Sequence, residues 1–266
     1  MRIVTWNVNG IRNPFSYSPW STSRSYKTIF ETLRADIIVL QELKMQRKDL
    51  TSQIAHVPGY ESFFTFPKAK KGYSGVAVYV NTEKCMPIKA EEGITGCLEN
   101  DKRIPWRELN GGIGGYSGID LLEGQFLDSE GRALILDFGM FVLIGIYCPN
   151  NSGPEREDYR LQYLDSLSRR VGNLIAAGRQ VIVAGDVNVC CSLLDTADPK
   201  EALRVSENGD FMSNPGRQWL GAFLKSCVKD VVREFWPERE GMFTCWNTKI
   251  NARPGNYGMC TCGFCD

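Results

Sequence analysis

The stretch Gln180-Val181-Ile182-Val183-Ala184-Gly185-Asp186-Val187-Asn188 decides the fold class of this chain. Residues 180–184 are mostly apolar and β-branched, which predicts a short strand buried on both faces. Two polar residues, Asp186 and Asn188, follow directly at its carboxyl end. A buried strand of this kind is typical of an α/β protein in which helices cover a sheet.

Working outward, three more strand ends carry polar side chains. Residues 3–6 lead into Asn7-Val8-Asn9-Gly10-Ile11-Arg12, residues 37–40 into Gln41-Glu42, and residues 141–146 into Tyr147-Cys148-Pro149-Asn150. If these ends meet, they form a set of hard oxygen donors: Asn7, Glu42, Asp186 and Asn188. This set suits Mg²⁺, which prefers carboxylate and carbonyl oxygens, and does not suit zinc, which prefers His and Cys.

Each of these signals has a simpler alternative. Asp-x-Asn after a strand is often turn chemistry or a helix cap. Glu42 could be a solvated residue after a strand, and Tyr147 could end its strand with the hydroxyl in water. The functional interpretation therefore depends on the combination.

The remaining elements predict one α/β layered sandwich with no linker inside it. A strand is expected over 74–80, and residues 132–138 and 141–147 predict an antiparallel hairpin. Apolar spacing predicts helices over 26–33, 158–177 and 218–225. Residues 91–118 are rich in glycine and charge and are interpreted as a long surface excursion.

Composition narrows the class of protein. The 266 residues carry 31 Lys plus Arg and 31 Asp plus Glu, which argues against a protein that coats DNA through a general basic surface. A local basic groove remains compatible with this balance. The ten cysteines show no secreted pairing pattern, no signal peptide precedes the first strand, and no apolar run is long enough to span a membrane. We therefore expect reduced cysteines and an intracellular protein.

Six ordered motifs resemble the exonuclease III family of the endonuclease/exonuclease/phosphatase superfamily. They are residues 6–12, 41–44, 72–77, 147–150, 185–189 and 244–258. The stretch Cys245 to Gly258 is most similar to the branch that contains the second eukaryotic apurinic/apyrimidinic endonuclease. The resemblance implies a DNase I-like fold, with two mixed β-sheets packed face to face and flanked by helices in four layers.

The resemblance also implies roles for individual residues. Glu42 would bind Mg²⁺ (with Mn²⁺ as an alternative), supported by Asn7. Asp186 would align and deprotonate the attacking water, Asn188 would hold the phosphate or orient Asp186, and Tyr147 would contact the scissile phosphate or the leaving oxygen. Asp186 and Asn188 are counted with Asn7 and Glu42 in the metal set. The DNA contacts would be Asn9, Asn150, Trp246, Asn251, Arg253 and Asn256.

The sequence departs from the family pattern after Gly258. The family continues with Arg-x-Asp-Tyr and later Ser-Asp-His strands, whereas this chain reads Met259-Cys260-Thr261-Cys262-Gly263-Phe264-Cys265-Asp266. We expect a domain over 1–258 that lacks its final strands, an open sheet edge, and an aberrant Cys-rich tail over 259–266. The one histidine, His56, lies outside every motif, so the family's catalytic histidine has no counterpart here.

Three functions remain open. The first is an abasic-site endonuclease with 3′-phosphodiesterase and 3′–5′ exonuclease activity, acting as a monomer on double-stranded DNA with an abasic site or blocked 3′ end. The second is a catalytically impaired DNA-binding product of the same family. The third keeps the enzyme but changes the substrate to RNA tails, inositol phosphates or sphingomyelin. The resemblance implies base excision repair in the nucleus, with the mitochondrion as the alternative, and no membrane partner.

Overall fold

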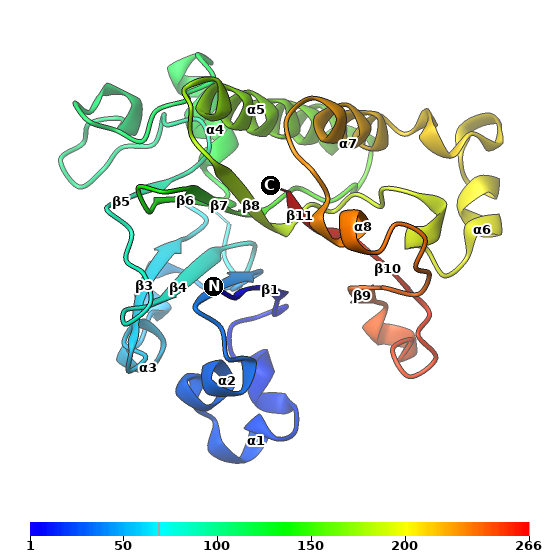
Figure 1. Ribbon diagram of the computed structural model, residues 1–266, viewed down its shortest axis with the longest axis horizontal. Coiled ribbons are helices and arrows are strands. Elements are labelled where there is room, and N and C mark those ends of the chain that lie inside the picture. The colour runs from blue at the N-terminus through cyan, green and yellow to red at the C-terminus, as the bar shows by residue number, and fades with distance from the viewer. Residues whose placement is uncertain (69, 266) are drawn as a thin grey trace.

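The computed structural model describes residues 1–68 and 70–265 (Figure 1). Its strands are β1 (Ile3–Asn7), β2 (Ile37–Gln41), β3 (Tyr60–Thr65), β4 (Val76–Asn81), β5 (Lys89–Glu92), β6 (Ala133–Asp137), β7 (Val142–Tyr147), β8 (Val181–Asp186), β9 (Cys245–Trp246), β10 (Gly258–Met259) and β11 (Cys262–Cys265). Its α-helices are α1 (Trp20–Ser23), α2 (Tyr26–Leu33), α3 (Ser52–Ala55), α4 (Leu121–Asp128), α5 (Glu157–Ala176), α6 (Pro199–Arg204), α7 (Pro215–Ser226) and α8 (Val231–Phe235).

Two mixed sheets form the centre of the molecule. The first has the order β1-β2-β4-β3, in which only β1 and β2 are parallel. The second has the order β11-β8-β7-β6-β5, in which only β7 and β8 are parallel. Their inner faces pack together through β-branched and leucine side chains, among them Val39 and Val78 from the first sheet and Leu136 and Leu143 from the second.

Helices cover the outer face of each sheet. The apolar side of α2, including Ile29 and Phe30, packs on the first sheet. The long helix α5 packs on the second sheet through Tyr163, Leu167 and other buried residues, and α7 joins the same cluster. Figure 1 shows α5 and α7 on one side of the sheets and α2 on the other. The architecture is therefore helix, sheet, sheet, helix, as expected for a sandwich in which each sheet buries both faces.

Most of the predicted elements are confirmed. Helix α2 has the predicted bounds, and the hairpin of β6 and β7 is antiparallel with Ala133 opposite Ile146. Helix α7 begins three residues earlier than predicted. The reason is local: Asn214 accepts hydrogen bonds from the N–H groups of Gly216 and Arg217, and Pro215 occupies the first turn.

The prediction of a surface excursion over 91–118 is wrong for its first part. Ile94, Thr95 and Cys97 are fully buried. The carboxylate of Asp128 accepts hydrogen bonds from the backbone N–H groups of Ile94 and Thr95, at 2.8 and 3.0 Å, and from the Thr95 hydroxyl. A buried carboxylate on α4 thus accepts the hydrogen bonds of backbone N–H groups that have no strand partner at this point. The content of glycine and charge in the sequence does not predict this contact.

Most of the segment expected to be an aberrant tail, 259–266, forms strands, and its last residue lies outside the described residues; β1 is an edge strand of the first sheet, so the expected open edge stays a prediction. Met259 belongs to β10, and residues 262–265 form β11, which pairs antiparallel with β8 so that Cys262 lies opposite Asp186. The segment predicted to be a tail therefore supplies a strand to the second sheet. Cys85, Cys97, Cys190, Cys191, Cys227 and Cys245 are present as thiols. None of the helices within 1–68 and 70–265 has the length and apolar character that crossing a bilayer requires.

Candidate active site

The polar strand ends predicted from the sequence meet at one end of the sandwich. In the first sheet Asn7 pairs with Gln41, so Glu42 follows immediately beyond β2. In the second sheet Tyr147 pairs with Asp186. Because β1 and β2 both contact β8 across the sandwich, the carboxyl ends of the two parallel pairs lie together.

Asn7 links the two carboxylates. Its side-chain nitrogen donates one hydrogen bond to Glu42 Oε1 and another to Asp186 Oδ2, both at 2.9 Å. Its side-chain oxygen accepts the backbone N–H of Asn9 at 3.0 Å, which fixes the orientation of the amide. A single nitrogen atom thereby holds Glu42 and Asp186, which are 144 residues apart in the sequence.

Two further groups hold Glu42. The hydroxyl of Tyr147 donates to Oε1 at 2.8 Å, and the ammonium of Lys44 forms an ion pair with Oε2 at 2.9 Å. Lys44 also donates to the side-chain oxygen of Asn9. Both oxygens of Glu42 are therefore engaged, and the carboxylate presents a defined orientation to the end of the sandwich.

The environment drives the two carboxyl pKa values in opposite directions. Burial acts to raise the pKa of Glu42, but hydrogen bonds from Asn7, Lys44 and Tyr147 outweigh it, and the net pKa lies below the ordinary value. Burial raises the pKa of Asp186, whose residue is only 5% exposed, and the charge of Glu42 adds to this increase. Environments that push the pKa values of two neighbouring carboxyl groups apart are typical of sites in which the two groups have different roles.

Asn188 supports Asp186 from the next turn. Its backbone N–H donates to Asp186 Oδ1 at 3.0 Å, and its side-chain nitrogen donates to the carbonyl of Cys148 at 2.8 Å. Strained backbone marks the same region: Asn9, Glu42, Lys44 and Asn188 all have φ between 51° and 56°. Non-glycine residues in this conformation cost free energy and cluster at functional sites.

The predicted DNA contacts divide into two groups. Trp246, Asn251, Arg253 and Asn256 lie on β9 or on the loop that leads to β10, where the indole N–H of Trp246 donates to Asn256 at 3.2 Å and Arg253 lies over the indole ring. At the start of β9, burial raises the pKa of the Cys245 thiol, and the charges of Asp186 and Glu42 add to this increase. Asn9 and Asn150 are exposed in the segments that follow β1 and β7.

Three residues of the site were not assigned a role from the sequence. Lys44 lies within a motif quoted above, so its charge next to Glu42 was an available signal. Thr261 bonds through its side chain to Asp186, which lowers that carboxyl's pKa. Arg132 lies over the ring of Tyr147, with 4.8 Å between the guanidinium carbon and the ring centroid. Nothing in the local sequence around Arg132 or Thr261 predicts these contacts.

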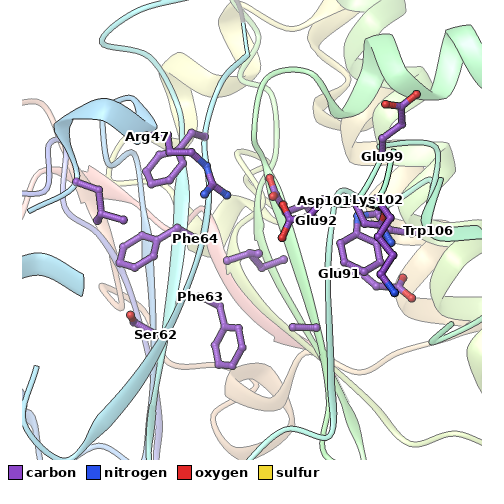
Figure 2. Close-up of a pocket in the computed structure, with 15 residues that line it drawn as sticks. Arg47, Ser62, Phe63, Phe64, Glu91, Glu92, Glu99, Asp101, Lys102 and Trp106 are labelled. Carbon is purple, nitrogen blue, oxygen red and sulfur yellow. Dashed lines mark hydrogen bonds between the residues drawn. The ribbon is translucent and has the colours of Figure 1, made fainter. Parts of the chain in front are cut away.

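A separate pocket of about 490 Å³ lies at the other edge of the sandwich. Figure 2 shows Phe63 and Phe64 of β3 on one side and Trp106, Asp101 and Glu92 on the other. None of the residues that line it belongs to the predicted site. The candidate site at the strand ends is therefore separate from this pocket.

Comparison with known proteins assigns the family. Residues 4–260 match the model of the endonuclease/exonuclease/phosphatase family. This chain belongs to that family. It is 48% identical over 97% of its length to the DNA-(apurinic or apyrimidinic site) endonuclease 2 of Schizosaccharomyces pombe, of which it covers 51%. It is 30% identical over 97% of its length to the exodeoxyribonuclease of Bacillus subtilis, of which it covers 84%.

Solved structures agree with this assignment. The catalytic domain of Xenopus laevis APE2 superimposes with a TM-score of 0.83 at 34% identity, over 100% of this chain and 82% of that one. The AP endonuclease of Leishmania major superimposes with a TM-score of 0.74 at 22% identity, which supports the fold. The chain spans about half the length of the curated endonuclease 2 relatives that it matches.

Proposed function

We propose that this chain is a Mg²⁺-dependent phosphodiesterase of DNA repair that acts at apurinic or apyrimidinic sites and on 3′ ends. The observation that carries the proposal is the placement of Glu42 and Asp186 around the amide nitrogen of Asn7. The substrate class is supported by the printed names of the family members that match nearly the whole chain, which are abasic-site endonucleases and an exodeoxyribonuclease.

The residues fit a hard divalent cation. Mg²⁺ is commonly bound through one or two carboxylates, keeps several waters and accepts phosphate oxygens. Glu42, with its lowered pKa, is the candidate ligand, and Asp186 and the amides of Asn7 and Asn188 complete the oxygen-rich surroundings. When bound, the ion neutralises charge on the phosphate. Within the part of the chain that the structure describes, no group of three or more His, Cys, Asp or Glu side chains is placed so that it could hold a metal ion.

The proton transfer is proposed for Asp186. A buried carboxylate with a raised pKa accepts a proton from a water molecule more readily than a solvated one. Hydrogen bonds from Asn7 and the Asn188 N–H hold its two oxygens, so the carboxylate is oriented before the substrate arrives. The water then attacks phosphorus in line, leaving a 3′-hydroxyl and a 5′-phosphate.

Tyr147 is proposed to act on the phosphate as a hydrogen-bond donor. Burial and the charge of Glu42 raise its pKa far above the ordinary value for tyrosine, so the phenol keeps its proton at neutral pH. Its single O–H donates to Glu42 without substrate and would turn to a phosphate oxygen or to the leaving oxygen when DNA binds, which stabilises developing charge. Arg253 and Trp246 on the neighbouring loop supply a cation and an aromatic surface for the DNA backbone.

The second candidate is a DNA-binding protein with impaired turnover. The observation that favours it is that the one histidine, His56, caps the end of α3 and has no place in the site. Loss of a positioned electrostatic group typically costs about 10²–10³-fold in rate. On this alternative the loop between β9 and β10 still binds DNA, but cleavage is slow.

One assay separates these candidates. A labelled duplex with a single abasic analogue is incubated with the chain in Mg²⁺ or in EDTA, and the product end is identified. Cleavage to a 3′-hydroxyl in Mg²⁺ alone, abolished in Glu42→Gln and Asp186→Asn but kept in the surface control Asp165→Asn, supports the first candidate. Binding without product supports the second. Turnover of an inositol phosphate without DNA cleavage would refute the DNA assignment.

A further inference from the structure

Arg132 makes three hydrogen bonds from a side chain that is only 1% exposed. Its Nε donates to Glu130 at 2.7 Å, its Nη1 to the carbonyl oxygen of Tyr147 at 3.0 Å, and its Nη2 to the hydroxyl of Tyr73 at 2.6 Å. Burying an arginine is costly, and a hydrophobic side chain of similar volume often stabilises a fold as well. Each of the three guanidinium nitrogens of Arg132 donates a hydrogen bond, to three separate residues, which points to a role in geometry.

The contacts between Arg132 and Tyr147 bracket the backbone of the tyrosine. Besides the bond from Nη1 to the Tyr147 carbonyl, the Tyr147 N–H donates to the Arg132 carbonyl at 2.8 Å. The guanidinium also lies over the tyrosine ring, 4.8 Å from its centroid. Both backbone polar groups and the ring face of Tyr147 are thus held by one residue, while its hydroxyl donates to Glu42.

Two neighbours fix Arg132 in turn. Glu130 is anchored on its far side by Arg156, at 2.9 and 3.0 Å. The ammonium of Lys70 lies 4.2 Å from the centroid of the Tyr73 ring. A continuous set of contacts therefore runs from Lys70 through Tyr73 and Arg132 to Tyr147 and Glu42.

We infer that Arg132 is a positioning residue for Tyr147, and that the hydroxyl of Tyr73 sets the position of Arg132. The inference rests on the proposed phosphodiester cleavage for its kinetic part only. Tyr73 then affects the rate through Arg132 and Tyr147, and not by touching the reacting atoms.

The sharpest variant is Tyr73→Phe, which keeps the ring and removes the hydroxyl that accepts from Arg132 and donates to Glu130 at 3.4 Å. We expect kcat on an abasic-analogue duplex to fall by about 10-fold, because small displacements of a catalytic group cost up to about 100-fold. KM, and the Kd for the same duplex in EDTA, should stay unchanged. Arg132→Lys keeps the charge but cannot form the three-way fork, so its kcat should fall further.

A double-mutant cycle tests the route. In a Tyr147→Phe background, Tyr73→Phe should cost nothing more, because the group that it positions has lost its hydroxyl. The matched control is Tyr116→Phe at the far edge of the sandwich. The hydroxyl of Tyr116 donates to Glu91 at 2.9 Å, and its ring lies under Arg170. The substitution Tyr116→Phe therefore removes a comparable hydroxyl beside another buried arginine. Its kcat and KM should equal those of the parent.

A second readout does not need activity. Tyrosines are replaced by 3-fluorotyrosine, and the ¹⁹F signal of Tyr147 is assigned by its absence in Tyr147→Phe. We expect this signal to move in Tyr73→Phe and Arg132→Lys and to stay in place in Tyr116→Phe, with the thermal unfolding midpoint monitored in each. If the parent chain does not cleave DNA, the proposed function fails but this measurement still decides the positioning role.

Three results would overturn the inference. They are an unmoved Tyr147 signal in both variants, an effect of Tyr73→Phe that persists in full in the Tyr147→Phe background, or an effect confined to KM and Kd. The last two would make Tyr73 a direct DNA contact instead.

Discussion

Replacement of Asn7 by alanine is the most direct test of the shared hydrogen-bond donor. The side-chain nitrogen of Asn7 is 2.9 Å from both Glu42 and Asp186, so Asn7→Ala leaves two neighbouring carboxylates with one donor fewer each. In the parent chain the hydrogen bond from Asn7 is the largest of the influences that lower the pKa of Asp186 against burial. The variant should therefore raise the pKa of Asp186 further.

The size of the effect follows from the contact that is lost. A hydrogen bond to a charged group contributes about 1.5–3 kcal/mol, and one pKa unit corresponds to about 1.36 kcal/mol. If the whole loss falls on the ionised form of Asp186, its pKa rises by about 1–2 units. Because Asp186 must be deprotonated to accept a proton, the acid limb of the kcat profile should move to higher pH by the same amount.

The assay is cleavage of an abasic-analogue duplex in Mg²⁺ across pH 5.5–9, about the range in which histidine-like and raised carboxyl groups titrate. Asn13→Ala is the matched control. Asn13 begins the 3₁₀ turn Asn13–Ser16 that follows β1. Its side chain donates to the Val8 carbonyl at 3.2 Å and to the Tyr17 hydroxyl at 3.4 Å, and neither acceptor is a carboxylate. An acid limb that stays in place in Asn7→Ala, with the fold intact by circular dichroism, would refute the reasoning.

Three further predictions address the sheet, a distant ion pair and the metal. Gly185→Ala should destabilise the fold by at least about 1–3 kcal/mol and abolish cleavage, since the added Cβ would lie 1.9 Å from the Ile146 carbonyl oxygen. Chemical denaturation measures the free energy of unfolding, and a value equal to that of the parent would contradict the close approach. Arg179→Ala should cost about 1.5–3 kcal/mol at pH 7, because Arg179 lowers the pKa of Asp137. The ion pair stabilises the fold above the unfolded carboxyl pKa of about 3.9 and stops doing so as pH falls through the folded pKa of Asp137. The unfolding free energies of parent and variant should therefore converge in acid denaturation. A difference in unfolding free energy that persists at acid pH would exclude the ion pair as the cause. Mg²⁺ should raise the unfolding midpoint of the parent but not of Glu42→Gln; an equal rise in both would place the ion elsewhere.

Much of the fold is visible in the sequence because it is encoded locally. Short β-branched runs such as residues 37–40 and 180–184 can hardly be anything but buried strands once helices of amphipathic spacing surround them. The stretch 91–118 was misjudged because glycine and charge content predict exposure. Here Asp128, which is distant in sequence, supplies the hydrogen bonds that allow Ile94 and Thr95 to be buried.

The candidate site was predicted only in part, for a related reason. Glu42 and Asp186 follow strands, and strand ends are readable from the order of residues. The partner of each side chain is not readable, because hydrogen bonds depend on angles and on register across the two sheets. Arg132 shows this most clearly, since its three acceptors come from positions 73, 130 and 147.

By itself, the sequence determined the α/β class, the family and the kinds of atom that the site can offer, since periodicity and motif order are local properties of the chain. Tertiary structure alone decided that one amide nitrogen of Asn7 holds both carboxylates, and that residues 262–265 lie along β8 beside Asp186. The physical reason is that these contacts are set by packing of the two sheets, which brings together residues that no local pattern connects.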